Sequence, residues 1–340
     1  MRQSILSAVV ISSMGAVSYG ASYHDLFTGL IVTGDSLADD GKFGALAPPS
    51  ADGQFSNEDV YAKRLAQDFV DAGKAAVNLA LAGATAGNTN TTVYPTELAS
   101  VTSQISTLAG QAGVIAQGYA DPAIRALAGM NPLVSIQFGG NDIMQQLFDG
   151  ADGTTIGFDA ADAVSDGIRG IASIDSTLFD DYLVFNLGNL ARTPRFAGTN
   201  LQDEAGAAST AFNARLQENI TALLSEGLNV QGLNLFGTLE NIGNNPSAFG
   251  ITDTTGQCIE SFFSTDLTNN CAVDLASGAV NPDNANDFFF VDDVHPSGTV
   301  HEEIAAQVRS QLAPVPLPAG MPLMLAGVAV FGVMRLRKSK

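Results

Sequence analysis

Five short apolar runs, each followed by turn-forming residues, constrain the fold of this 340-residue chain more than any other feature. Such a run, bounded by glycine, asparagine or aspartate, is typical of a buried β-strand. The turns include Gly34-Asp35 after the first run and Gly139-Gly140-Asn141-Asp142 after the third. The runs span residues 30–33, 75–79, 133–138, 182–186 and 229–235.

Helical spacing of apolar residues lies between these runs. Phe212, Leu216 and Ile220, for example, recur at four-residue steps. Strands that alternate with helices predict an α/β fold whose parallel sheet is covered on both faces. In such sheets, ligands bind beyond the carboxyl ends of the strands. The predicted helices span residues 60–72, 211–224 and 299–312.

The charge of the chain excludes two classes of partner. Its 35 Asp and Glu residues outnumber its 15 Lys and Arg residues, which gives a formal net charge of −20. Residues 1–21 hold one basic residue and residues 319–340 hold four, with no acid in either segment, so the charge between them is −25. Nucleic acids and anionic lipid surfaces bind basic faces, so neither is an expected partner. Hydrophobic residues make up 46% of the chain, which is enough for a sizeable core.

Residues 1–20 have the features of a secretory signal peptide. Arg2 provides a short basic region, and residues 5–17 are mostly apolar. Ser18 and Gly20 are small residues at positions −3 and −1 of the cleavage site that would end the segment. We therefore expect the protein to be exported from the cytoplasm.

The C-terminal segment resembles a bacterial sorting tail. Residues 315–319 are Val-Pro-Leu-Pro-Ala, an apolar run continues to Met334, and a basic end begins at Arg335. This order is similar to the PEP-CTERM class of sorting signals in its VPLPA variant, which implies that a membrane sorting protease handles the tail. A simple membrane anchor is the alternative, since the run is about long enough to span a bilayer. Either reading makes residues 21–314 an extracellular or cell-surface domain and residues 315–340 its tail.

The two cysteines, Cys258 and Cys271, both lie in the exported part of the chain. An oxidising compartment favours a single disulfide between them, which would close a small loop. Two cysteines do not complete a four-ligand zinc site, and His295 and His301 are too few and too differently spaced to complete one with them. We expect no metal.

Histidine is scarce, so an imidazole base must be His24, His295 or His301. His24 follows the predicted signal peptide, where chain ends are often loose. His295 has Asp292 and Asp293 just before it, and a carboxylate there can fix the imidazole tautomer and stabilise the imidazolium. His301 falls at the start of a predicted helix. We therefore favour His295, with Asp292 as its partner and Asp293 as the alternative.

Ser36 is the candidate nucleophile, because it follows the first predicted strand and its glycine turn. A lone serine at such a position is more often a helix N-cap. Two other strand ends change that balance: Gly83 follows the second strand with a backbone N–H, and Asn141 follows the third with a side-chain amide. The tetrahedral intermediate of acyl transfer needs preorganised donors of this kind.

Four sequence blocks, taken in their order along the chain, resemble those of the GDSL, or SGNH, hydrolase family. Further similarity to the secreted lipase, phospholipase and haemolysin-like branch extends the resemblance over residues 28–312. The sequence departs from that branch at Lys42, where asparagine is usual, and at Ala82, where glycine is frequent. The blocks are Gly34-Asp35-Ser36-Leu37, Gly83, Gly140-Asn141-Asp142, and Asp292 with His295.

The resemblance implies a role for each matched residue. Ser36 would attack an ester carbonyl, His295 would accept its proton, and Asp292 would orient His295. The backbone N–H groups of Ser36 and Gly83 and the side-chain amide of Asn141 would stabilise the oxyanion.

The family also implies a three-layer α/β/α sandwich with a flavodoxin-like parallel sheet of about five strands, and no cofactor. Asp35 and Asp142 are expected to shape their turns through hydrogen bonds. The predicted function is that of a secreted serine esterase or lipase acting on a small ester or lipid. The alternatives are an acyltransferase or polysaccharide O-deacetylase with the same triad, and a non-catalytic surface or adhesion module on the same fold.

Residues 143–180 and 238–290 are expected to be irregular insertions that wall the pocket. Both are rich in phenylalanine, which would suit an acyl chain, although most phenylalanines in proteins belong to a core. The chain has no tryptophan, which weakens the case for sugar stacking. The phenylalanines concerned are Phe148, Phe158, Phe179, Phe262, Phe263 and Phe288-Phe289-Phe290.

Overall fold

The structure is a computed structural model that describes residues 22–87, 89–120, 125, 129 and 131–313. His24–Leu312 form one compact unit, and the second unit, Met1–Tyr23 with Ala313–Lys340, is almost entirely outside the described residues. The predicted signal peptide and sorting tail also lie outside them. Within the described residues, no helix combines the length and apolar character needed to cross a membrane.

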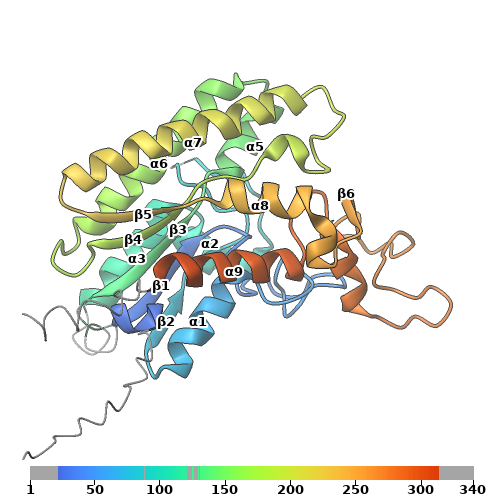
Figure 1. Ribbon diagram of the computed structural model, residues 1–340, viewed down its shortest axis with the longest axis horizontal. Helices are drawn as coiled ribbons and strands as arrows, with labels where there is room; N and C mark the ends of the chain where they lie inside the picture. Colours follow the sequence, from blue (N-terminus) through green and yellow to red (C-terminus); the bar gives the residue numbers. More distant parts are fainter. Residues whose placement is uncertain (1–21, 88, 121–124, 126–128, 130, 314–340) are drawn as a thin grey trace, which may run out of the picture. The chain divides into compact units, whose positions relative to one another are not determined.

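A five-stranded parallel sheet forms the centre of this unit, as the sequence predicts (Figure 1). The strand order is β2-β1-β3-β4-β5, so the chain starts in the interior of the sheet and crosses over to build each half. β1 and β3 are buried along their whole length, which explains why both appear in the sequence as continuous apolar runs. The strands are β1 (Gly29–Gly34), β2 (Ala75–Asn78), β3 (Pro132–Gln137), β4 (Asp181–Phe185) and β5 (Asn229–Leu233).

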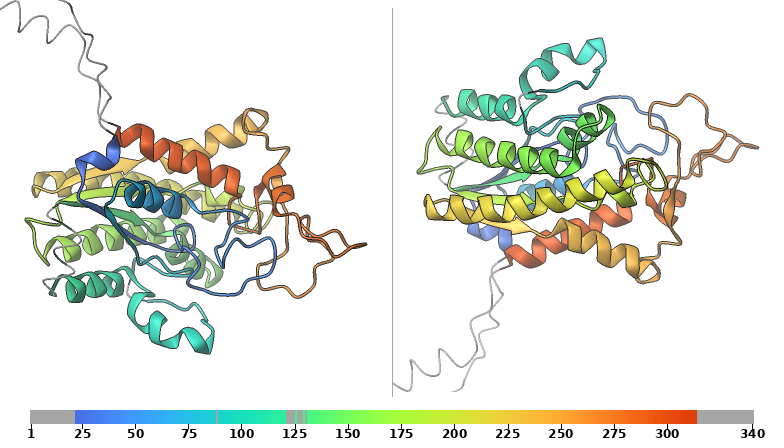
Figure 2. Two further views of the ribbon diagram at one scale, coloured as in Figure 1. Left: turned by 90° about the horizontal axis from the view of Figure 1, so that it is seen from below. Right: turned by 90° about the horizontal axis from the view of Figure 1, so that it is seen from above.

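Helices cover both faces of the sheet and complete the predicted three layers (Figure 2). On one face, α1 (Tyr61–Asp71) packs against α9 (Gly298–Leu312), and α8 (Leu235–Asn244) lies beside α9. The other face carries α3 (Leu108–Ala120), α5 (Gly140–Phe148), α6 (Gly153–Ala172) and α7 (Gln202–Ser225).

Shorter elements connect these layers. The helix α2 (Ala99–Ile105) packs against α3, and the sequence patterns predict neither of the two. The 3-10 helices are η1 (Tyr23–Leu26), η2 (Thr96–Leu98), η3 (Leu190–Arg192), η4 (Pro246–Phe249) and η5 (Pro282–Asp287).

The expectation of an irregular insertion at residues 143–180 is wrong, because this segment contains most of α5 and all of α6. α6 lies along α7, and small residues make the contact. A Cβ added at Gly157 would lie 2.4 Å from the backbone oxygen of Ala208. α6 nevertheless carries buried apolar residues at helical steps, namely Ile156, Ala160, Val164, Ile168 and Ile171.

The second expected insertion, residues 238–290, is regular in part. It begins within α8, and β6 (Asp253–Gln257) pairs with β7 (Phe288–Phe290) in a separate two-stranded parallel sheet. Its strands are short and follow no apolar alternation that would reveal them in the sequence.

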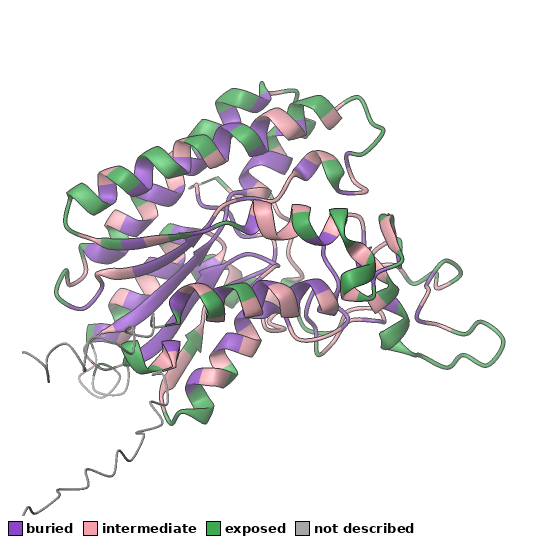
Figure 3. Ribbon diagram, viewed as in Figure 1, coloured by how far each residue is buried: buried purple, intermediate pink, exposed green. Residues whose placement is uncertain are grey.

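Burial follows the layers (Figure 3). The largest core cluster joins the sheet to α3, α5, α6 and α7, and includes Ile136, Phe179 and Phe212. A smaller cluster lies beyond the carboxyl edge of the sheet and includes Phe55, Phe262 and Val291. This second cluster supports the residues around His295, so the fold places a packed layer next to the candidate site.

Candidate active site

Ser36 lies two residues beyond the end of β1, at the carboxyl edge of the sheet. Gln111 of α3 holds this strand end. Its side-chain oxygen accepts a hydrogen bond from the Gly34 N–H at 3.0 Å, and its side-chain nitrogen donates to the Gly34 carbonyl at 3.0 Å. Gln111 is fully buried, so water does not compete for these bonds. No motif marks this residue, and α3 contains a second glutamine, Gln117, that the sequence does not distinguish from it.

Ser36, His295 and Asp292 form a chain of hydrogen bonds. The Oγ of Ser36 lies 2.8 Å from Nε2 of His295. On the other side of the ring, Nδ1 of His295 lies 2.8 and 2.9 Å from the two carboxylate oxygens of Asp292. All three residues are buried. The structure therefore brings together the serine, histidine and aspartate that the sequence places in a triad.

Asp292 is held as a carboxylate. Its Oδ1 also accepts hydrogen bonds from the backbone N–H groups of His295 at 2.7 Å and Val294 at 3.0 Å. Burial alone would raise the pKa of this carboxyl. The charge of His295 and the hydrogen bonds from its ring and backbone outweigh burial, and the pKa of Asp292 is lowered. An ionised Asp292 fixes the Nδ1–H tautomer of His295 and leaves Nε2 to face Ser36.

Asp293, the alternative partner of His295, is engaged elsewhere. The guanidinium of Arg195 donates two hydrogen bonds of 2.8 Å to its carboxylate, and the Arg195 N–H donates to the Asp293 carbonyl at 2.9 Å. These two guanidinium hydrogen bonds, which we call the Arg195 fork, attach the chain around His295 to the segment after η3. Sequence patterns give no indication of Arg195, because its partner is 98 residues away.

One cavity is lined by the three predicted oxyanion donors, Ser36, Gly83 and Asn141, and by His295. Among the described residues, the backbone N–H groups of Ser36 and Gly83 have no hydrogen-bond acceptor. Gly83 has φ +79°, and a Cβ there would lie 2.5 Å from Cγ2 of Thr92, so the position requires glycine. The amide nitrogen of Asn141 donates to the Ala84 carbonyl at 3.0 Å, which leaves its second hydrogen for a ligand.

Two buried aspartates connect the sequence blocks, and one of them is the predicted Asp142. Its carboxylate accepts hydrogen bonds from the N–H groups of Ala86 at 2.8 Å and Gly87 at 2.7 Å. Asp39 accepts from the N–H of Ala82 at 2.8 Å. Burial raises the pKa of both carboxyls. These bonds fix the segment around Gly83 against the strand ends on either side.

Asp35 shapes the turn that carries the nucleophile. Its Oδ1 accepts a hydrogen bond from the Leu37 N–H at 3.0 Å, and Gln137 approaches its Oδ2 at 3.4 Å. Burial raises the pKa of Asp35 to about 7, although the Leu37 N–H and the charge of His295 act in the opposite direction. Asp35 and Asp292 are thus two buried carboxyls of one site with opposite pKa shifts.

The other two histidines do not line the cavity. His301 is fully buried, and its Nδ1 accepts a hydrogen bond from the Tyr61 N–H at 3.3 Å. Burial, assisted by the charge of Arg64, lowers the pKa of His301 to about 3, so this imidazole is neutral. Nδ1 of His24 lies 3.5 Å from Asp25, in η1. In the part of the chain that the structure describes, no three His, Cys, Asp or Glu residues are grouped as metal ligands.

The cavity has a volume of about 450 Å³ and a mostly apolar wall. The ring of Phe55 lies 4.9 Å from that of His295, and Phe43 lies 5.4 Å from Phe55. The predicted phenylalanines divide into several groups. Phe148, Phe263, Phe289 and Phe290 line the cavity, Phe179 and Phe262 belong to the two cores, Phe288 packs beside the smaller core, and Phe158 is exposed away from the cavity.

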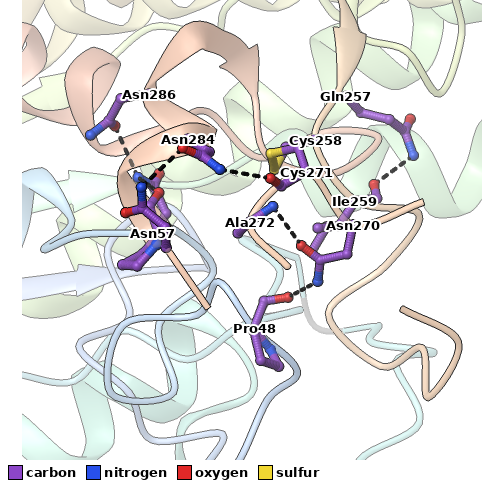
Figure 4. The surroundings of a disulfide bond; sticks show 12 residues. Pro48, Asn57, Gln257, Cys258, Ile259, Asn270, Cys271, Ala272, Asn284 and Asn286 are labelled. Carbon is purple, nitrogen blue, oxygen red and sulfur yellow. Dashed lines mark hydrogen bonds between the residues drawn. A yellow bond between two sulfur atoms is a disulfide. The ribbon is translucent and has the colours of Figure 1, made fainter. Parts of the chain in front are cut away.

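Cys258 and Cys271 are joined by a disulfide, with their Cα atoms 5.1 Å apart (Figure 4). The loop that they close is attached to its surroundings on two sides. The N–H of Ile259 donates to the Val291 carbonyl at 2.8 Å, next to Asp292. The side chain of Asn270 donates to the Pro48 carbonyl at 2.6 Å, as Figure 4 shows. The loop places the ring of Phe262 6.1 Å from that of His295 and the ring of Phe263 5.8 Å from that of Phe55.

Comparisons with known proteins complete this description. No curated protein matches the chain. Solved structures that resemble it include a lipase from a goat rumen metagenome, with 14% identity over 83% of this chain and 96% of that one and a TM-score of 0.40. They also include a carbohydrate acetylesterase from Sinorhizobium meliloti, with 12% identity, coverage of 84% and 98%, and a TM-score of 0.43. An acetylxylan esterase from Geobacillus stearothermophilus has 13% identity, coverage of 86% and 97%, and a TM-score of 0.43.

The family comparison matches most of the chain. The model of the family described as GDSL-like Lipase/Acylhydrolase aligns with residues 30–308, a range that includes all four sequence blocks and every residue of the five-stranded sheet except Gly29. The chain therefore belongs to the GDSL-like lipase/acylhydrolase family and is a hydrolase of ester bonds.

Proposed function

We propose that the protein is a serine esterase in which Ser36 is the nucleophile, His295 the general base and Asp292 its orienting partner. The observation that carries this proposal is the unbroken chain of contacts from Ser36 Oγ through the imidazole to Asp292, with 2.8 Å on each side of the ring. Such a chain is the arrangement that activates a serine hydroxyl.

The reaction proceeds in two halves. Ser36 Oγ bonds to the ester carbonyl carbon while Nε2 of His295 takes the hydroxyl proton. The tetrahedral intermediate then breaks its bond to the alcohol oxygen, and His295 gives the proton to the leaving alcohol. Water repeats the sequence on the acyl-enzyme, which releases the acid and restores Ser36.

The oxyanion is stabilised by the N–H groups of Ser36 and Gly83 and by the amide of Asn141. The first two are free to donate, and the third retains one hydrogen. Donors fixed in a buried site stabilise developing charge because they need no reorganisation during the reaction. The Gly83 carbonyl accepts hydrogen bonds from the side chains of Asn90 and Thr92, and the Asn141 amide donates to Ala84, so both donors are fixed, which supports this assignment.

Replacing the nucleophile tests the proposal. Ser36→Ala should abolish hydrolysis of p-nitrophenyl butyrate and labelling by a fluorophosphonate probe. Ser103→Ala, on the exposed face of α2, is the matched control and should keep both. Hydrolysis that survives in a folded Ser36→Ala variant would sink the proposal. Product analysis with an added alcohol separates hydrolysis from acyl transfer. Release of acetate from an acetylated glycan tests the alternative that the enzyme is a polysaccharide O-deacetylase.

We also propose that the enzyme is exported, with removal of residues 1–20, retention of the Cys258–Cys271 disulfide and sorting of the tail at the cell surface. The signal-like segment, the two cysteines and the tail sequence support this proposal. The intact mass of the protein recovered from outside the producing cell tests it. A mass that includes the first 20 residues, or two free thiols, would contradict it.

A further inference from the structure

Three exposed apolar side chains gather at the mouth of the candidate active site. Val93, Phe148 and Phe263 all line the cavity that contains Ser36. They are 91%, 60% and 60% exposed, and within the described residues they are three of the four most exposed large apolar side chains. Isolated exposed apolar residues need no explanation, but a group at one opening indicates an interaction surface.

The three side chains come from three segments, and Phe43, from a fourth, connects two of them. Phe263 lies 5.4 Å from Phe43, and Phe43 lies 6.0 Å from Tyr94, the neighbour of Val93 in the chain.

On its other side, the Val93 segment joins α5. The N–H of Thr91 donates to Gln145 at 3.0 Å, and Gln145 donates to Thr92 at 3.2 Å. Gln145 lies one helical turn before Phe148, the last residue of α5. The three apolar residues therefore form one rim, which we call the apolar rim.

The charge around the apolar rim limits what it can bind. The three segments that form it, residues 87–95, 140–152 and 258–266, contain no lysine or arginine. They do contain aspartate or glutamate, including Asp149 and Glu260 next to or near the exposed rings. The basic side chains nearby are Arg192 and Arg195 in the cavity wall and Lys42 beside Phe43, and each pairs with an acid: Glu240, Asp293 and Asp40. An anionic surface would therefore be repelled by the acids and would have to compete with them for these cations. An uncharged or zwitterionic apolar partner fits both the exposed rings and the acidic surroundings.

We propose that Val93, Phe148 and Phe263 insert into the surface of an aggregated, electrically neutral lipid ester, so that its molecules pass from the aggregate to Ser36. The inference rests on the proposed esterase function and names its substrate class. The continuity of the rim with the cavity supports this occupant, because a molecule leaving the lipid surface at the rim meets a mostly apolar wall on its way to the nucleophile.

The absence of tryptophan from the chain provides a local test. Phe148→Trp and Phe263→Trp each introduce a single indole at the rim, and Phe158→Trp introduces one at an exposed position on α6 away from the cavity. With phosphatidylcholine vesicles, the emission of the two rim variants should move to shorter wavelength, and brominated phosphatidylcholine should quench it. Phe158→Trp should show neither effect. Phosphatidylglycerol vesicles should give a smaller shift at the rim.

A kinetic comparison checks the same inference without a reporter. Phe148→Ser and Phe263→Ser should each weaken vesicle binding by about tenfold or more, the expected effect of exposing one buried phenylalanine ring to water. Their activity on micellar short-chain phosphatidylcholine should fall further than their activity on the same lipid below its micelle concentration. Phe158→Ser should leave that ratio unchanged.

The outcomes separate this inference from the proposed function. If no rim indole shifts while p-nitrophenyl butyrate is still hydrolysed, the esterase proposal stands and the lipid surface is wrong. If the shift grows with protein concentration in the absence of vesicles, a second copy of the chain covers the rim, which also overturns the inference. If Ser36 is neither labelled nor needed for hydrolysis, the esterase proposal itself fails.

Discussion

The candidate site has two parts that are built in different ways. The strand-end part, which carries Ser36, Gly83 and Asn141, lies at the carboxyl edge of the parallel sheet, where buried side chains such as Gln111 and Asp142 fix the strand ends. The histidine loop, residues 291–296, is held by contacts with segments outside the sheet: the Arg195 fork and the Arg195 backbone hydrogen bond, the aromatic rings and the disulfide loop. The comparison teaches that the nucleophile and the oxyanion donors follow from the fold itself. The base follows from contacts that the fold does not require.

The largest expected effect is in the histidine loop, where two neighbouring aspartates differ in role. Asp292→Asn should lower kcat by roughly 10⁴, because the amide favours the wrong imidazole tautomer and cannot stabilise the imidazolium. Asp293→Asn weakens only the contact with Arg195 and should lower kcat far less than Asp292→Asn does. Steady-state hydrolysis of p-nitrophenyl butyrate measures both. If Asp293→Asn has the larger effect, the assignment of the partner is reversed.

The next effect belongs to the strand-end part. Asn141→Ala should lower kcat by about 10²–10³ with little change in KM, because the amide stabilises charge that develops only in the transition state. The variant also loses the hydrogen bond to Ala84, so thermal unfolding serves as the control for folding. An equal rise in KM with kcat unchanged would show that Asn141 binds substrate and does not stabilise the oxyanion.

The disulfide provides a way to disturb one part and spare the other. Replacing both cysteines by serine, Cys258→Ser with Cys271→Ser, should lower the free energy of unfolding by roughly 3 kcal/mol, the effect expected for a loop of about this size. Activity should fall through the histidine loop, because the same loop attaches to the chain beside Asp292. Urea unfolding with and without reductant measures the effect. The double variant is its own control, since reductant should not affect it.

The difference between the two parts also explains which features the sequence predicts. All five strands are correctly predicted. The central strands β1, β3 and β4 are buried and appear as continuous apolar runs, whereas the edge strands β2 and β5 are partly exposed and are marked by the turns that follow them. Ser36, Gly83 and Asn141 are found because each follows one of these strands. α6 is missed although Ile156, Val164 and Ile168 recur at helical spacing in its sequence.

The contacts that support the site could not be predicted from the sequence. Gln111 and Arg195 hold the two parts in place, yet each is a single residue whose partner is distant in sequence. Spacing along the chain contains no information on such pairs. The burial of Gln111 and the direction of Arg195 depend on tertiary packing, so only the structure reveals them.

The smallest expected effect is a change in the free energy of unfolding from one pH value to the next. It concerns one carboxyl from each part, Asp35 and Asp292. The pKa of Asp35, at the strand ends, is raised to about 7, so the unfolded chain releases this proton at lower pH than the folded protein does. Stability therefore falls as pH rises from about 4 to about 7, by at most about 1.4 kcal/mol per pH unit. Asp35→Asn removes this decline, and its stability relative to the unmodified protein should rise over that range and then stay constant.

Asp292, in the histidine loop, should behave in the opposite way. Its pKa is lowered, so its contribution to stability is present above the pKa of the unfolded chain and is lost as pH falls through the folded value. Urea unfolding of Asp35→Asn, Asp292→Asn and the unmodified protein at several pH values between 3 and 8 gives both differences. Opposite pH slopes would show that the two carboxyls of one site are held in different charge states. Parallel slopes would contradict the contrast between the two parts, because it requires a neutral carboxyl beneath the nucleophile below pH 7 and an ionised one behind the base.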